Sequence, residues 1–366
     1  MVTRREFLKK AGKATAASAA IGAGYLFADS ALDYLSRNMM VRPDLPIGEL
    51  FLLGFENTRI GLLEEFHDHF GLGGVIVFGR NFESPSELKE IVDEIKARTS
   101  TNLIVAVDQE GGDVARLSGS GFPTFPSPAY YGEKGDLPAA VHAAKVTSEK
   151  LNEIGINMNL GPVADVLTNP DNVLMKHRSY SGDVTEVCRF VRSIVGAQSE
   201  FGVASCAKHF PGLGDASIDP HKEAAVSEQA AEFFEKNMFP PFAAAVEAGV
   251  SAIMTTHLFV PSLDPVHMAT FSRRICDGIL REWMGFEGVI VTDDLKMHAV
   301  DDAKEAVPKA LSAGHDMVLV GTSFDEQLFF AGRLWEGVES GEVPKAAISR
   351  KIDRVKQLKT RFEMLT

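Results

Sequence analysis

Val289-Ile290-Val291-Thr292-Asp293-Asp294 is a short apolar run, rich in β-branched residues, that ends directly in two carboxylates. A run of this kind, without polar alternation, is typical of a strand that is buried on both faces of a parallel sheet. Seven further apolar runs of similar length lie at residues 50–55, 75–78, 103–107, 158–163, 203–207, 252–254 and 317–320. The chain therefore predicts eight buried strands.

Longer amphipathic stretches separate these runs. Apolar residues recur with helical spacing at residues 84–98, 137–154, 184–201, 227–248 and 273–283, and again at the end of the chain at 345–362. Strands and helices that alternate in this way indicate an α/β fold. Eight such units predict one domain, a (β/α)8 TIM barrel over residues 41–366. The alternative is a doubly wound open sheet, but no Gly-rich phosphate loop follows the first run.

The composition argues against several classes of protein. The chain has 37 Lys and Arg against 50 Asp and Glu, a net charge of −13, whereas a nucleic-acid partner requires a basic surface. Beyond the N-terminus, no segment has the roughly 20 apolar residues of a membrane-spanning helix. Cys188, Cys206 and Cys276 lack metal-type spacing, and we expect Cys206 to be a small buried hydrophobe. We expect a globular monomer without cofactor, metal or nucleic acid.

The first 40 residues have the pattern of a targeting segment. Arg4 and Arg5 are followed by Phe7 and Leu8, and residues 14–28 then carry no charge and are rich in Ala and Gly. A basic start followed by a weakly apolar run indicates a signal segment, and the adjacent arginines fit the twin-arginine type. A basic first turn of an ordinary helix is the alternative. We therefore expect the twin-arginine export machinery as a partner and a periplasmic or extracellular location, with an uncleaved segment acting as a tether.

Charged residues follow most of the predicted strands. Because a barrel forms its active site at the carboxyl ends of the strands, these residues should meet on one rim. Buried charges are costly unless they are paired or used. Carboxylates mixed with Lys, Arg and His suit an uncharged polyhydroxylated substrate such as a small carbohydrate. The residues at the strand ends are Arg80, Asp108, Asp165, Lys208, His209, His257, Asp293 and Asp294.

A metal-dependent hydrolase is the strongest rival from residue types alone. His209, His221, His257 and Asp293 could ligate zinc. Metal-binding barrels, however, usually place a His-x-His pair on the first strand, and residues 50–55 contain no histidine.

The segment after the fifth predicted strand carries a candidate acid/base pair. Residues 208–221 contain two glycines and two prolines, which indicates a loop that can fold over a ligand. Pro220 favours an extended conformation at Asp219, which would put the side chains of Asp219 and His221 on the same side. A carboxylate beside an imidazole favours its protonated form, as a general acid near neutral pH requires. A hydrogen bond that merely stabilises the loop explains the pair equally well.

This loop resembles the KHFPGxGD…DxH signature of glycoside hydrolase family 3, in its bacterial β-N-acetylhexosaminidase branch. The resemblance extends over most of residues 48–322. Residues 108–117 (DQEGGDVARL) are similar to the DQEGGxVxRL motif, 161–166 (GPVADV) to APVxDV, and 177–180 (HRSY) to DRSF. Residues 253–257 (IMTTH) with 269–272 (ATFS) are similar to IMTAH…ATFS, and 291–297 (VTDDLKM) to the SDDLxM nucleophile motif.

The resemblance implies a role for each matching position. Asp293 would be the nucleophile of a retaining glycoside hydrolase, and His221, supported by Asp219, the acid/base. The sugar would be held by Asp108, Arg116, Arg178, Lys208 and His209. The chain would be a β-N-acetylhexosaminidase that acts on cell-wall or chitin-type oligosaccharides through a covalent glycosyl-Asp intermediate.

Three positions depart from the family pattern and put the details of sugar contact in question. Leu213 stands where His is frequent, Pro220 where Ser is commoner, and His177 where Asp is common. The chain ends soon after the eighth predicted strand, without the second α/β domain of the family's β-glucosidases, which favours the hexosaminidase branch. An N-acetylglucosaminide phosphorylase, a β-glucosidase and an inactive sugar-binding protein stay open as alternatives.

Overall fold

Eight parallel strands form one sheet in the computed structural model, which describes residues 43–363 except 100–101, 120, 217–224 and 297–302. The signal-like segment, Asp219 and His221 lie outside the described residues. The strand order is β11-β9-β7-β6-β3-β2-β1-β12. The strands are β1 (Phe51–Gly54), β2 (Gly74–Val77), β3 (Ile104–Val107), β6 (Met158–Asn159), β7 (Ala204–Phe210), β9 (Ala252–Thr255), β11 (Val289–Thr292) and β12 (Val318–Val320).

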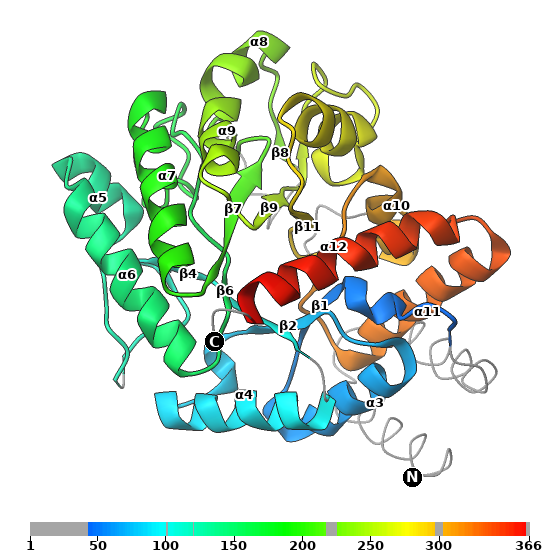
Figure 1. Cartoon of the computed structure of the whole chain (residues 1–366). Helices are drawn as coiled ribbons and strands as arrows, with labels where there is room; N and C mark the ends of the chain where they lie inside the picture. Colours follow the sequence, from blue (N-terminus) through cyan, green and yellow to red (C-terminus); the bar gives the residue numbers. More distant parts are fainter. Residues whose placement is uncertain (1–42, 100–101, 120, 217–224, 297–302, 364–366) are drawn as a thin grey trace, which may run out of the picture.

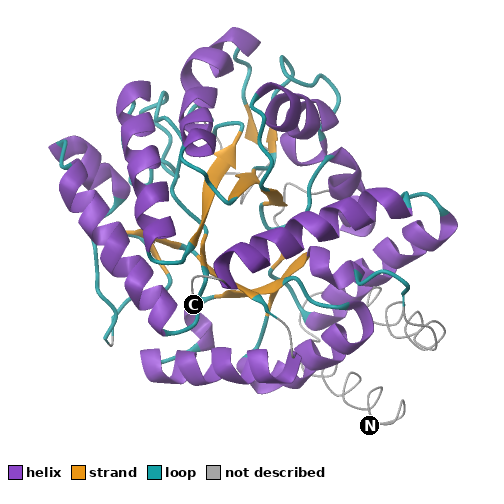
Figure 2. Ribbon diagram, viewed as in Figure 1, coloured by secondary structure: helices purple, strands orange, loops and turns teal. Residues whose placement is uncertain are grey.

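The two outer strands of this order meet and close the sheet into a barrel. Val291 and Met317 form a parallel bridge between the ends of the order. The N–H of Thr292 also donates to the carbonyl of Met317 at 3.2 Å. Figure 2 shows the strands at the centre, with helices around them. The predicted (β/α)8 TIM barrel is confirmed, and each of the eight apolar runs contains a strand.

Helices cover the outside of the barrel (Figure 1). α7 illustrates why they form: the Asp183 side chain accepts the Glu186 N–H at its start, and Val187, Val191 and Ile194 bury one face. The larger helices are α3 (Ile60–Phe70), α4 (Pro85–Thr99), α6 (Leu137–Glu153), α7 (Val184–Glu200), α9 (Phe239–Glu247), η6 (Arg274–Trp283), α10 (Ala303–Ala313), α11 (Phe324–Ser340) and α12 (Lys345–Glu363).

Shorter elements decorate the strand and helix ends. Two small sheets, β4 (Gln109–Gly111) with β5 (Val114–Ala115) and β8 (Ala225–Val226) with β10 (Leu258–Phe259), lie in loops that follow barrel strands. The remaining pieces are η1 (Ile47–Leu50), η2 (Asn57–Arg59), η3 (Gly79–Asn81), α5 (Pro128–Lys134), α8 (Ala231–Phe233), η4 (Phe234–Met238) and η5 (Ala269–Phe271).

Three boundaries differ from the sequence prediction by three or more residues. β6 ends at Asn159 instead of residue 163: the Gly161 N–H turns back to the Asn159 carbonyl at 2.9 Å, and pairing with β7 resumes only at Val163, as a single bridge to Lys208. β7 continues to Phe210, so Lys208 and His209 lie within the strand instead of after it. The helix predicted at 227–248 begins at Ala231, since Ser227 lies in the extended segment that follows β8.

Two adjoining apolar cores hold the barrel and its helices together. One surrounds β1, β2, β3 and β12, and the other surrounds α7, α9 and the apolar side chains of β7 that face them. Cys206 is fully buried, as predicted, and all three cysteines are free thiols. Among the described residues, no helix combines the length and apolarity that crossing a bilayer requires.

Candidate active site

Charged side chains from separate strands meet at the carboxyl end of the barrel. Asp108 directly follows β3, Lys208 and His209 lie near the end of β7, and Asp293 directly follows β11. Arg178 reaches them from the segment between β6 and α7. The structure thus brings together most of the residues that the sequence singled out.

Glu110 is the centre of a buried ion cluster. Its carboxylate accepts two bonds from Arg178, Nε to Oε2 at 2.9 Å and Nη2 to Oε1 at 2.8 Å. Lys208 Nζ lies 2.7 Å from Glu110 Oε1 and 2.6 Å from Asp108 Oδ1. The side chains of Glu110 and Lys208 are 1% and 2% exposed, so water cannot replace these partners. The cluster fixes the positions of both cations.

The charge states in this cluster follow from the pairing. Burial by itself would raise the pKa of Glu110, but the neighbouring Lys208 and Arg178 hold it far below the ordinary value. Burial would lower the pKa of Lys208, yet Asp108 and Glu110 raise it instead. Both groups therefore stay charged at neutral pH and form a rigid set of donors and acceptors.

Asp165 and Arg178 determine which nitrogen of His209 carries the proton. Arg178 can only donate, so His209 Nε2, 3.0 Å from Arg178 Nη2, must accept. His209 Nδ1 is then the donor to Asp165 Oδ2, at 2.8 Å. Asp165 is fully buried and also accepts the N–H groups of His209 at 3.0 Å and Leu213 at 2.5 Å. Asp165 thus orients the imidazole.

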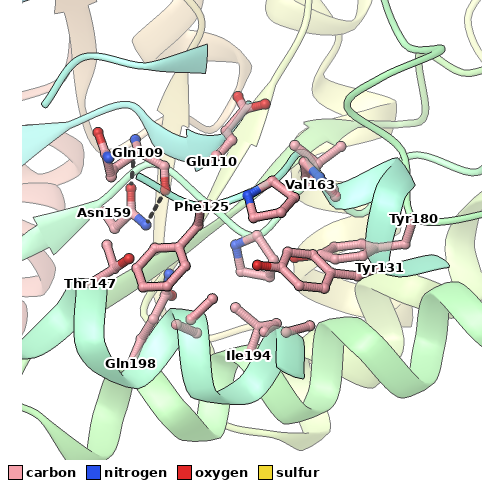
Figure 3. Close-up of a pocket in the computed structure, with 18 residues that line it drawn as sticks. Gln109, Glu110, Phe125, Tyr131, Thr147, Asn159, Val163, Tyr180, Ile194 and Gln198 are labelled. Atoms are coloured by element: carbon pink, nitrogen blue, oxygen red, sulfur yellow. Dashed lines mark hydrogen bonds between the residues drawn. The ribbon is translucent and has the colours of Figure 1, made fainter. Parts of the chain in front are cut away.

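Asn159 supports the turn that carries Asp108 and Glu110. Its side chain accepts the Gln109 N–H and donates to the Gln109 carbonyl, both at 3.0 Å, as the dashed lines of Figure 3 show. Behind this turn lies an enclosed cavity of about 50 Å³ between the barrel wall and helices α6 and α7. The cavity is too small for a sugar, and Glu110 lines its side towards the ion cluster.

Arg116 provides the exposed edge of the cluster. Its Nη2 lies 3.8 Å from Asp108 Oδ2, and its side chain is 39% exposed, against 17% for Asp108. Arg116 Nε is buried and has no hydrogen-bond partner within the described part of the chain. A buried donor without a partner normally binds water or a ligand.

Asp293 has one oxygen held by the backbone. The Asp294 N–H donates to its Oδ1 at 2.8 Å, and Oδ2 has no hydrogen-bond partner among the residues described. Burial would raise the pKa of Asp293, but the electrostatic effects of His209 and His257, the Asp294 amide and Lys208 together hold the pKa below the ordinary value. Asp293 is therefore an ionised carboxylate at neutral pH.

His257 positions the turn that carries Asp293. Its Nε2 lies 3.0 Å from the carbonyl of Asp294, which can only accept, so Nε2 carries a proton. Its Nδ1 contacts Thr270 Oγ1 at 2.7 Å, and the ring is fully buried. Both ring nitrogens of His257, like those of His209, are engaged by protein groups, so neither imidazole fits the zinc-ligand role considered above.

The sequence reasoning missed Glu110 and gave Asp165 no specific role. Both residues lie within the quoted motifs, and Asp165 was noted at a strand end. The available signal was their position three and two residues, respectively, after predicted strands three and four. Asp219 and His221 are the site residues whose placement is not described. Among the described residues on either side of that segment, Asp215 accepts hydrogen bonds from Ser227 at 2.8 Å and Gln229 at 3.1 Å.

Comparisons with known proteins agree with this geometry. Residues 47–358 match the glycosyl hydrolase family 3 N-terminal domain. A protein of Nitrosomonas eutropha named beta-hexosaminidase is 34% identical over 258 residues, which are 68% of this chain and 73% of that protein.

Solved structures give the same picture. A glycoside hydrolase family 3 beta-N-acetylglucosaminidase from Paenibacillus superimposes with a TM-score of 0.84 at 32% identity, over 87% of this chain. The chain spans only 62% of that longer protein. A beta-N-acetylhexosaminidase from Beutenbergia cavernae superimposes with a TM-score of 0.79 at 26% identity, over 88% of this chain and all of that one.

Proposed function

The chain belongs to glycosyl hydrolase family 3, and on this premise we propose that it is a retaining β-N-acetylhexosaminidase. It releases terminal N-acetylglucosamine from cell-wall or chitin-type oligosaccharides. The names of the similar proteins support the hexosaminidase reaction. The state of Asp293 supports the retaining mechanism and is the observation on which the proposal depends.

A nucleophile must be ionised and must have an oxygen free to attack. Asp293 meets both conditions, because its pKa is lowered and the Asp294 amide holds only Oδ1. Its backbone is fixed on both sides: the Asp293 N–H donates to the Thr255 carbonyl at 3.0 Å, and His257 binds the Asp294 carbonyl. The free oxygen is thus held in one place at the rim.

The reaction proceeds in two steps. In the first, Asp293 forms a bond to the anomeric carbon while the bond to the leaving oxygen breaks and His221, as imidazolium, protonates that oxygen. In the second, neutral His221 takes a proton from water, the water oxygen bonds to the anomeric carbon, and Asp293 leaves. The roles of His221 and its partner Asp219 rest on the motif resemblance.

The ion cluster holds the sugar in this proposal. Asp108 and Lys208 bind hydroxyl groups, and Arg178 and His209 line the ring. Arg116 Nε supplies a further donor from the exposed edge. Hydrogen bonds between sugar hydroxyls and charged groups are stronger than neutral ones and are fixed in direction by the pairing described above.

We also propose export of the chain, with the machinery that reads paired arginines as its partner. Arg4 and Arg5 and the charge-free residues 14–28 support this proposal. Fusing residues 1–40 to a reporter that folds before export tests it. The reporter should reach the periplasm, and replacing both arginines by lysine should stop it.

A panel of aryl glycosides tests the activity, with and without inorganic phosphate. We expect release from the aryl N-acetylglucosaminide but not from the glucoside, and no sugar 1-phosphate. Hydrolysis of the aryl glucoside alone would reject the hexosaminidase, and sugar 1-phosphate would identify a phosphorylase. A 5-fluoro N-acetylglucosaminide with a good leaving group, which keeps the 2-acetamido group, should label Asp293, and the Asp293→Asn variant should stay unlabelled.

The proton shuttle requires a second test. His221→Ala should lose far more activity on substrates with poor leaving groups than on activated aryl glycosides, because only the former need protonation. Equal losses on both kinds of substrate would reject the role of His221 and leave the nucleophile unaffected.

A further inference from the structure

Asp294 is an acidic residue of the rim to which the two reaction steps assign no part. It directly follows the proposed nucleophile, so two carboxylates lie on adjacent residues. Burial raises the pKa of Asp294, and the charge of Asp293 acts in the same direction, whereas the N–H groups of Gly321 and Lys296 oppose them. A carboxylate in such a place is costly to keep unless its oxygens are used.

The polar groups of Asp294 bind three separate parts of the rim. Its N–H donates to Asp293 Oδ1 at 2.8 Å, and its carbonyl accepts from His257 Nε2 at 3.0 Å. Its Oδ1 accepts the N–H groups of Lys296 and Gly321, both at 3.1 Å. The Lys296 bond shapes the turn itself, whereas the Gly321 bond reaches the segment that follows β12.

The bond between Asp294 and Gly321 lies where the barrel closes. In the part of the chain that the structure describes, a single bridge joins the segments of β11 and β12, in place of a ladder. A side-chain bond continues this seam, because the Leu319 N–H donates to Thr292 Oγ1 at 3.1 Å. The Gly321 N–H extends the seam by two further residues towards the carboxyl end of the barrel.

Gly321 allows the carboxylate to come this close. The backbone of Gly321 is not in the left-handed region, so the local conformation does not demand a glycine there. A Cβ at this position, however, would overlap Asp294 Oδ2 and lie 3.3 Å from the Phe78 ring. Gly321 thus leaves space for Oδ2 while its N–H holds Oδ1.

We propose that Asp294 is a positioning residue: its carboxylate fastens the turn after β11 to the segment after β12 and so directs the free Oδ2 of Asp293 at the anomeric carbon. The inference rests on the proposed retaining mechanism. The two bonds to Oδ1 require an oxygen acceptor and not a negative charge, since both donors are neutral backbone N–H groups. A misplacement of about 1 Å can cost about 100-fold in rate, so a small displacement of the turn is sufficient.

Two substitutions at Asp294 separate the acceptor from the charge. In the full-length chain, Asp294→Ala removes the acceptor, and kcat on an aryl N-acetylglucosaminide should fall on the order of 10- to 100-fold. KM should change by less than about twofold, because the ion cluster proposed to bind the sugar is untouched. The rate at which the 5-fluoro N-acetylglucosaminide labels Asp293 should fall with kcat. Asp294→Asn keeps an oxygen in the same place and should restore kcat to within about threefold of the unaltered protein.

Gly321→Ala approaches the same contact from the other side. Its Cβ would push the Asp294 carboxylate out of place, so kcat should fall in the unaltered background and hardly any further in Asp294→Ala. Losses that add in the double variant would count against the contact. Asp353→Ala, at an exposed position of α12, is the control and should leave kcat and labelling unchanged.

Hydrogen exchange provides a readout that needs no substrate. The Gly321 amide should exchange faster in Asp294→Ala than in the unaltered protein and at the unaltered rate in Asp294→Asn, with the thermal midpoint of each variant measured beside it. A kcat of Asp294→Ala within about threefold of the unaltered value, an equal loss in both Asp294 variants, or unchanged exchange at Gly321 overturns the inference, while hydrolysis by the unaltered protein still supports the hexosaminidase. If the unaltered protein cleaves no N-acetylglucosaminide, both proposals are wrong.

Discussion

Two buried ion clusters lie at opposite ends of the same barrel. At the carboxyl ends of the strands, Glu110 binds Arg178 and Lys208. At the amino ends, Asp316 lies two residues before β12, binds Arg281, and accepts from Arg354 Nη1 at 2.9 Å. The chemistry is the same in both: one fully buried carboxylate between two cations.

The two clusters differ in the groups to which they are hydrogen-bonded. Around Asp316 the bonds end on other parts of the protein: the Ile290 N–H donates to Oδ2 at 2.9 Å, and Arg281 also donates to the carbonyls of Phe286 and Gly288. This cluster joins η6, through Arg281, and α12, through Arg354, to the sheet. The Glu110 cluster instead ends in groups at the open rim, such as Arg116. We therefore expect the Asp316 cluster, at the amino ends of the strands, to contribute to stability and the Glu110 cluster, at the carboxyl ends, to contribute to function. Four predictions test this division.

The largest effect should come from Asp293→Asn. The amide keeps the shape of the side chain but cannot attack, so kcat should fall on the order of 10³- to 10⁵-fold. The thermal midpoint should change little, because the Asp294 N–H still finds an oxygen acceptor. Steady-state kinetics and calorimetry on the same preparation separate the two quantities. Activity within tenfold of the unaltered protein would exclude Asp293 as the nucleophile.

Asp316→Asn should lower the stability of the protein and leave its activity unchanged. It leaves Arg281 and Arg354 without a counter-charge in a buried place, which costs about 3–5 kcal/mol of the free energy of unfolding. Denaturant titration measures this loss, while kcat per folded molecule should stay unchanged. Asp353→Asn, at an exposed position of α12, is the matched control and should change stability by less than about 0.5 kcal/mol. A selective loss of kcat in Asp316→Asn would contradict the division.

A smaller effect on activity should follow from Asp165→Asn. The new amide would present a donor where His209 Nδ1 now donates, so the imidazole would change tautomer and turn an N–H towards Arg178. The N–H groups of His209 and Arg178 would then face and repel each other, and kcat/KM should fall roughly 30- to 100-fold. The chemical shifts of the ring nitrogens report the tautomer directly. A loss of activity without a change of tautomer would show that Asp165 acts only through stability.

The smallest effect concerns acid stability. Because the pKa of Glu110 is lowered in the folded protein, its ionised form adds stability that is fully present above the ordinary glutamate value, about 4.3. That stability is lost as the pH falls below this value towards the lowered pKa. Glu110→Gln should be less stable at pH 7 but should lose on the order of 1–3 kcal/mol less between pH 5 and 2. Urea titrations at several pH values measure the two slopes, and parallel slopes would contradict the assignment.

Local patterns in the chain were sufficient to predict most of the fold. The Val-rich run before Asp293 lacks polar alternation and is rich in β-branched residues, which is typical of a strand covered on both faces. The end of β6 was mispredicted, because the apolar run continues while the Gly161 N–H bonds to the Asn159 carbonyl instead of to a neighbouring strand.

The site could be predicted only in part. The position of Asp108 and Asp293 after strands was enough to place them on one rim. Glu110 could not be told from an exposed glutamate, because the two residues that neutralise it are 68 and 98 positions away along the chain, at Arg178 and Lys208. The tautomer of His209 depends likewise on Asp165 and Arg178.

The sequence by itself determined the number of strands, their burial and the kinds of side chain at their ends, since each of these depends on a few consecutive residues. The tertiary structure decided which of those side chains are charged, which proton each carries and which cations lack a partner. These properties arise from electrostatic interactions and desolvation between distant segments, and a linear pattern does not contain the distances on which they depend.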